Sequence, residues 1–157
     1  MVGGGKEFVK EKIKYIRDGR APIPKKETIS RVMSANRAKG TKPELILRKA
    51  LRIAGISGSR SHLPNIPGRP DAVFPKEHLA IFVHGCFWHR CSYCKDPLPK
   101  THRSFWKKKF LANKLRDKKK NAELRKLGWR VLTVWECQIK RDAVVVAERI
   151  KRSLALR

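Results

Sequence analysis

The chain has 157 residues, a length typical of one domain that buries its own core, and 41% of them are hydrophobic, which argues against global disorder. No apolar run of about 18 residues occurs, so a membrane-spanning helix is excluded. The chain has 39 Lys and Arg residues but only 13 Asp and Glu residues, which gives a formal net charge of +26. Such a charge is tolerated mainly when a polyanion neutralises it, so nucleic acid is the expected partner.

Charge alone leaves open a ribosomal or histone-like protein that only coats phosphate. A membrane-surface role fits less well, because the basic residues are spread over the whole chain and are not confined to one amphipathic stretch. The first six residues carry glycines and then charge, with no signal-peptide core. We therefore expect a cytoplasmic protein associated with the nucleoid.

Residues 1–27 are predicted to form a basic N-terminal arm, and residues 28–157 a single compact domain. Within the arm, Val9, Ile13 and Ile16 recur at helical spacing, and two prolines stiffen the linker that follows. The sequence leaves open whether the arm is a disordered basic tail or an ordered segment that grips DNA.

The domain is predicted to be an α/β fold with the order helix, two strands, long basic helix, strand and closing helix. The first helix follows the capping-box pattern Thr41–Glu44 and ends before Gly55. The strands are expected over residues 71–74, 79–83 and 130–135, with a tight turn over 75–78 between the first two.

The three predicted helices are assigned core-facing stripes from their apolar spacing. These are Leu45, Leu47, Leu51 and Ala54 in the first, Phe105, Leu111, Leu115, Ala122 and Leu127 in the long helix over about 104–127, and Val144, Ala147, Ile150 and Leu154 in the last. Trp129 and Trp135, which flank the third strand, are also expected in the core.

The four cysteines, Cys86, Cys91, Cys94 and Cys137, are predicted to bind Zn²⁺. A close cysteine cluster in a cytosolic protein indicates metal binding rather than disulfides, and Zn²⁺ prefers four soft ligands in a tetrahedron. His89 is the rival fourth ligand, and four buried free thiols are the alternative to any metal. If all four cysteines bind, no position is open for catalysis and the zinc is structural.

Five motifs along residues 30–150 together resemble the very-short-patch-repair (Vsr) mismatch endonucleases. The motifs are Pro67–Asp71 (PGRPD), His84–His89 (HGCFWH), Phe105-Trp106, Asn113 with Arg116-Asp117, and Gly128–Val131 (GWRV) with Trp135–Cys137 (WEC). The resemblance implies a restriction-endonuclease-like fold, in which a mixed central sheet is flanked by helices. It also implies Mg²⁺ at the cutting site and a structural zinc.

The acidic residues fit that chemistry. Asp71 follows Pro70 at a strand end, where its carboxylate can hold Mg²⁺ as a hard oxygen ligand; the alternative is that it only caps the turn. Many restriction-type nucleases carry an acid-x-Lys pair on the second strand, but here the positions read Phe82-Val83-His84. By resemblance, the backbone carbonyl of Val83, where the family commonly has Thr, replaces the missing acid as a metal ligand.

His84 and His89 are the expected acid–base groups, because imidazole titrates close to neutral pH. The resemblance implies that His89 activates water while His84 and Asp117 form a supporting pair; Asp117 is alternatively a surface partner of nearby lysines. Glu44 resembles the family's additional active-site carboxylate, with its capping-box role as the alternative.

Phe87, Trp88 and Trp106 are, by resemblance, DNA-binding aromatics that insert into the base stack beside a mismatch, with core packing as the alternative. The resulting prediction is a monomeric enzyme that nicks one strand 5′ to the T of a T:G mismatch, with mismatch-repair proteins as candidate partners. The alternatives are a related nuclease with another mismatch or sequence target, and a non-catalytic, zinc-stapled module that bends damaged DNA.

Overall fold

The computed structural model describes residues 40–61 and 63–156. The predicted arm over residues 1–27, and residues 28–39 of the predicted domain, lie outside this range. The elements, in chain order, are α2 (Lys42–Ile53), β1 (Ala72–Phe74), β2 (Leu79–His84), α3 (Cys86–His89), α4 (Arg103–Lys126), β3 (Arg130–Trp135), α5 (Glu136–Arg141) and α6 (Ala143–Ala155). The predicted order is found, with the short helices α3 and α5 added to it.

The three strands form one mixed sheet in the order β1-β2-β3. β1 and β2 are antiparallel, with Val73 opposite Ala80, as the tight turn over residues 75–78 requires. β2 and β3 are parallel from Leu79 opposite Arg130 to His84 opposite Trp135. α4 makes the connection between them, which a parallel pair needs.

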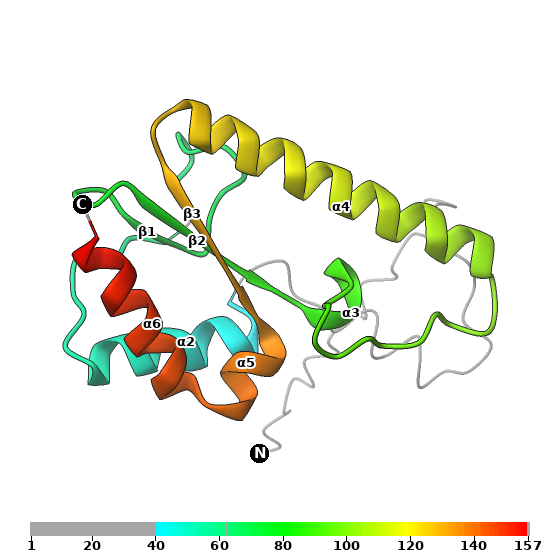
Figure 1. The fold of residues 1–157 in the computed structure, drawn as a ribbon, viewed down its shortest axis with the longest axis horizontal. Helices are drawn as coiled ribbons and strands as arrows, with labels where there is room; N and C mark the ends of the chain where they lie inside the picture. The colour runs from blue at the N-terminus through cyan, green and yellow to red at the C-terminus, as the bar shows by residue number, and fades with distance from the viewer. Residues whose placement is uncertain (1–39, 62, 157) are drawn as a thin grey trace, which may run out of the picture.

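Helices cover both faces of the sheet: α2, α5 and α6 lie on one side and α4 on the other (Figure 1). Side chains of β2 alternate between two cores, because successive strand residues point to opposite faces. Leu79 and Ile81 join the α2–α6 core, whereas Ala80 and Phe82 join a smaller core with Leu124 of α4. His84 continues the second set, so its imidazole lies on the α4 side of the sheet.

The predicted apolar stripe of α4 was wrong. Four of its five residues are exposed: Leu111, Leu115 and Leu127 are each 59% exposed, and Ala122 is exposed as well, while Phe105 is half-buried. The buried residues are instead Phe110, Asn113 and Leu124. The face that meets the rest of the molecule is therefore largely polar, and an apolar pattern could not reveal it.

Smaller differences concern the other helices and two tryptophans. Leu45 of α2 and Val144 of α6 are exposed, while Ala50 and Val146 are buried. Trp129 packs half-buried against the smaller core, and Trp135, also half-buried, lies edge-on to His84 with ring centroids 5.5 Å apart. In the described part of the chain, no helix has both the length and the apolar character to cross a membrane.

Candidate functional site

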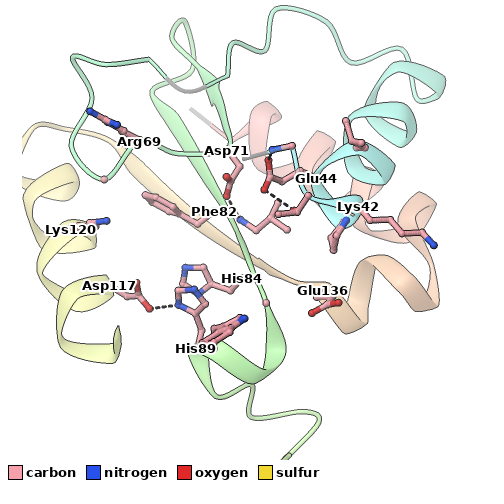
Figure 2. Close-up of a pocket in the computed structure, with 18 of the residues that line it drawn as sticks. Lys42, Glu44, Arg69, Asp71, Phe82, His84, His89, Asp117, Lys120 and Glu136 are labelled. Carbon is pink, nitrogen blue, oxygen red and sulfur yellow. Dashed lines mark hydrogen bonds and ion pairs between the residues drawn. The ribbon is translucent and has the colours of Figure 1, made fainter. Parts of the chain in front are cut away.

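A cleft of about 710 Å³ opens beside the C-terminal half of β2, between the start of α2, the loop that precedes β1, the end of α3 and the inner face of α4 (Figure 2). Its lining includes every residue predicted for catalysis: Glu44, Asp71, His84, His89 and Asp117, together with Val83. It also contains Glu136 and the three cations Lys42, Arg69 and Lys120. Residues that are far apart in the sequence thus share one concave, mixed-charge surface.

Asp71 is held in place by the backbone of β2. Its N–H donates to the Ile81 carbonyl at 2.9 Å, and its Oδ2 accepts from the Val83 N–H at 2.7 Å. Burial raises the pKa of this carboxyl from 3.8 to about 6, partly offset by the Val83 bond, and the charge of Glu44 raises it further. Desolvation therefore disfavours the ionised carboxylate, and a bound cation would offset that cost.

The carbonyl of Val83 faces the same side as Asp71. Within a strand, the N–H and C=O groups of one residue point toward the same neighbouring strand. This is why two residues in a hydrogen-bonded antiparallel pair can exchange both of their N–H···O bonds. The Val83 N–H is turned to Asp71, and β1 pairs with residues 79–81 of β2 and not with Val83. A carboxylate and a carbonyl thus lie together, and both are hard oxygen donors suited to Mg²⁺.

The two imidazoles and Asp117 form a compact group in which the expected pairing is changed. The rings of His84 and His89 stack with centroids 3.9 Å apart, but Asp117 Oδ2 accepts from Nδ1 of His89, at 2.5 Å, and not from His84. In this structure Asp117 is therefore hydrogen-bonded to His89 and not to His84. With Nδ1 engaged, Nε2 of His89 carries the lone pair that can accept a proton.

His84 is the more buried of the two imidazoles. Burial lowers the pKa of His84 to about 4, and the charges of His89 and Lys120 lower it further, while Asp117 opposes the shift. The ring is therefore neutral at pH 7. It packs between the edge of Trp135 and the face of His89, which fixes the orientation of the second ring.

Glu44 joins the cleft to the beginning of α2. Its carboxylate accepts from the Thr41 hydroxyl at 2.7 Å and from the Gly40 N–H at 2.9 Å. The Thr41 side chain makes no cap hydrogen bond to α2. Only half of the predicted capping box is therefore formed, in which the Glu44 side chain bonds back to the residues at the start of the helix. Glu44 nevertheless lines the cleft and acts on Asp71, so the structural and active-site roles are compatible.

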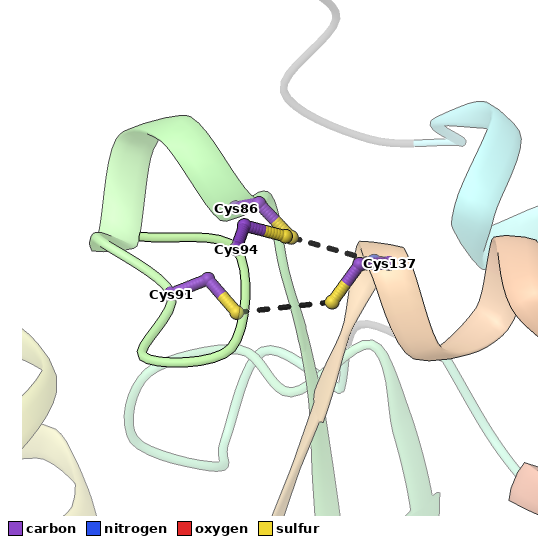
Figure 3. Close-up of side chains that lie close together, drawn as sticks. All are labelled: Cys86, Cys91, Cys94 and Cys137. Atoms are coloured by element: carbon purple, nitrogen blue, oxygen red, sulfur yellow. Dashed lines mark hydrogen bonds between the residues drawn. The ribbon is translucent and has the colours of Figure 1, made fainter. Parts of the chain in front are cut away.

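The four cysteines come together beyond the ends of β2 and β3 (Figure 3). Their sulfurs lie within 4.8 Å of one another, and those of Cys91 and Cys137 are 3.8 Å apart. Zn–S bonds of about 2.3 Å in a tetrahedron give a sulfur–sulfur edge of roughly 3.8 Å. The donor set therefore fits a structural Zn²⁺, while the rival ligand His89 is bonded to Asp117 instead.

Two polar residues that received no predicted role, Glu136 and Asn113, bind the backbone of α3, the short helix that begins with Cys86. Glu136 accepts from the Cys86 N–H at 3.3 Å and forms an ion pair with Lys140. The buried Asn113 donates to the Trp88 carbonyl at 2.9 Å. Asn113 and Glu136 both lie in the motifs quoted above, but only the fold shows what they contact.

Phe87, Trp88 and Trp106 belong to one aromatic cluster between α3 and α4. The Phe87 ring lies 5.1–5.4 Å from those of Trp88, Trp106 and Phe110, measured between centroids. Phe110 is buried, whereas the three predicted DNA-binding aromatics are half-buried. Trp88 also lines the cleft, so the cluster continues directly into the candidate site.

Comparison with known proteins assigns the chain to a family. The family profile for DNA mismatch endonuclease Vsr matches residues 22–95. The type II nicking enzyme V.XorIIP of Xanthomonas oryzae is 43% identical over 123 residues, covering 78% of this chain and 89% of that protein. V.NmeAIP of Neisseria meningitidis, also named a type II nicking enzyme, is 40% identical, with 77% and 85% covered. DNA mismatch endonuclease Vsr of Escherichia coli is 38% identical, with 76% of each chain covered.

The cleft and these relatives define an enzyme that hydrolyses a DNA phosphodiester bond, a DNA nicking endonuclease. The chain belongs to the Vsr family of these enzymes. A non-catalytic DNA-binding module is therefore no longer a competing explanation.

If the cysteine cluster holds zinc, freshly purified, DNA-free protein should contain one Zn²⁺ per chain by elemental analysis. Cys137→Ser should lose the metal and destabilise the loop that carries His89, because three thiolates hold Zn²⁺ less tightly. Ser92→Ala, in the same loop but outside the sulfur cluster, is the matched control and should keep the zinc. Metal-free parental protein would contradict the assignment.

Proposed function

We propose that the enzyme nicks one strand of duplex DNA on the 5′ side of the T in a T:G mismatch and so initiates very short patch repair. It is proposed to act as a monomer on a restriction-endonuclease-like core. One observation carries the proposal: Trp88 lies both in the half-buried aromatic cluster and in the lining of the cleft. An aromatic that enters the base stack at this point would put the neighbouring phosphate into the site, and a mispaired step costs least to open.

A second candidate is nicking at another mismatch or at a defined sequence. It is favoured by the names of two of the relatives above, which are called type II nicking enzymes. The aromatic cluster suits both candidates in part, because unstacking helps any enzyme that distorts DNA. The choice of duplex in the nicking assay separates them.

We propose the following division of roles in the cleft. The Asp71 carboxylate and the Val83 carbonyl would hold Mg²⁺, and the bound ion would supply positive charge to polarise the water and to offset the negative charge on the phosphate. His89 accepts a proton from the attacking water at Nε2, while Asp117 orients its ring through Nδ1. His84, neutral and stacked on His89, limits the movement of that ring.

The target is tested with duplexes that differ at one base pair. In Mg²⁺, a T:G duplex should be nicked in the T strand, 5′ to the T, at least about tenfold faster than the matched T:A and C:G duplexes. The reason is that opening a base step costs a few kcal/mol, and this cost is lowest at a mispaired step. Equal nicking of matched and T:G duplexes would favour the sequence-directed candidate.

The catalytic roles predict two different failures. Asp71→Asn removes the charge that holds the cation, so cleavage should vanish and extra Mg²⁺ should restore little. His89→Ala removes proton transfer but leaves the metal ligands, so the rate should fall on the order of 10²–10⁴-fold. The residual rate should rise with pH as hydroxide replaces the missing base. Single-turnover nicking at several pH values measures both effects.

Folding controls for these two variants follow from the pKa of Asp71. A carboxyl whose pKa is raised to about 6 by burial costs stability when ionised, so Asp71→Asn should not lower Tm at neutral pH without metal. Asp142→Asn is the matched control, because Asp142 caps α6 and Asn caps equally well. Parental cleavage by Asp71→Asn would mean that the proposed metal site is wrong.

If Trp88 enters the base stack, Trp88→Ala should weaken binding to the mismatched duplex by about 1–3 kcal/mol, roughly 5- to 150-fold. Its Tm should change little, because Trp88 packs against neither of the two hydrophobic cores. Trp129→Ala is the contrasting variant: it should lower Tm and keep the preference for mismatched over matched DNA. A large fall in Tm with unchanged mismatch preference in Trp88→Ala would place this ring in the core.

A further inference from the structure

Lys120 differs from the other lysines of α4 in its position. Phe110, Asn113, Asp117, Lys120 and Leu124 follow one another at intervals of three or four residues, so they share one face of the helix. This face meets the sheet and the cleft. The adjacent residues Lys118 and Lys119 are exposed, whereas Lys120 is partly buried.

The stem of Lys120 is fixed by the loop that leads to Asp71. A Cβ added at Gly68 would lie 3.1 Å from Cζ of Phe82 and 3.2 and 3.3 Å from Cδ and Cβ of Lys120. The methylenes therefore pack over the Gly68 backbone beside the Phe82 ring, and the charged end continues into the cleft (Figure 2). Gly68 also has φ of +79°, which suits glycine.

The ammonium group has no anionic partner in residues 40–61 and 63–156. Lys119 pairs with Glu123 at 4.0 Å and Lys140 with Glu136 at 2.5 Å, but no ion pair of Lys120 is formed there. Its charge is close enough to act on the imidazole of His84. A partly desolvated cation beside the acid–base group is suited to an anion that arrives with the substrate.

We propose that Lys120 contacts the phosphate of the nicked bond and donates to a non-bridging oxygen. There its charge offsets the negative charge that grows as water attacks. The assignment rests on the proposed roles of Asp71 and His89 in the same cleft. It does not depend on which base pair the enzyme selects, because the contact is made to the backbone of DNA.

The first test is single-turnover cleavage at saturating DNA, with whichever duplex the parent nicks. Lys120→Met keeps the packed stem and removes the charge, so the rate should fall on the order of 10²–10³-fold. Lys120→Arg keeps the charge and should retain most of the rate. Lys119→Met, on the exposed side of α4, should cleave like the parent.

Including Asp71→Asn in the same assay separates the two proposals. If Asp71→Asn is inactive while Lys120→Met cleaves at the parental rate, the role of Lys120 is wrong and the metal site stands. If Asp71→Asn also cleaves normally, the proposed site fails and the assignment of Lys120 fails with it. Tm values of the three lysine variants close to that of the parent exclude misfolding as the cause.

The second test replaces the phosphate at the nicked position by a neutral methylphosphonate and measures binding without Mg²⁺. On the ordinary duplex, Lys120→Met should reduce the slope of log K against log salt by about one, the value for one lost phosphate contact. On the methylphosphonate duplex the same substitution should change nothing, because the contact is already gone. Equal losses on the two duplexes would overturn the proposal, since a merely structural lysine would act on both alike.

Discussion

The parallel pairing of β2 with β3 determines where the functional groups of this protein lie. In the register of the two strands, His84 stands opposite Trp135, and both strands end at that pair. Cys86 and Cys137 each follow two residues later, so side chains 51 positions apart meet at one edge of the sheet. The Cys137 N–H donates to the Cys86 sulfur there, and His89 follows on the same short helix as Cys86. Anchoring the thiol cluster therefore also positions His89.

The position of the long helix α4 along the chain was predicted from the sequence, but the face that it turns inward was not. Its apolar residues Leu111 and Leu115 are exposed, whereas the face toward the site has polar residues between Phe110 and Leu124. Burying polar groups costs free energy unless each finds a partner. Asn113 finds the Trp88 carbonyl and Asp117 finds His89. A hydrophobic pattern detects only the burial of apolar side chains. It therefore cannot give the orientation of a helix whose inward face carries polar residues of the site.

The site itself was predictable where spacing along one segment carries the information. Asp71 beside β2 belongs to that class, because β1, the turn and β2 leave few alternative arrangements. Cys137, by contrast, joins the other three cysteines only through the pairing of β2 with β3. The pairing of Asp117 was not, because the choice between His84 and His89 depends on how α3 turns after Gly85. The left-handed conformation of Arg90 that ends α3 is likewise invisible in the sequence.

The electrostatics of the cleft bear on how a chain of charge +26 handles an anionic substrate. Four of its 13 acidic residues, Glu44, Asp71, Asp117 and Glu136, line this one cleft in the described part of the chain. Glu136 is balanced by its ion pair with Lys140, and Asp117 accepts a hydrogen bond from His89. Burial raises the pKa of Asp71, and the negative charge of Glu44 raises it further. A phosphate entering the cleft would add to that repulsion unless a cation came with it. The proposed Mg²⁺ and the ammonium of Lys120 would both relieve this repulsion, so DNA and metal should bind cooperatively.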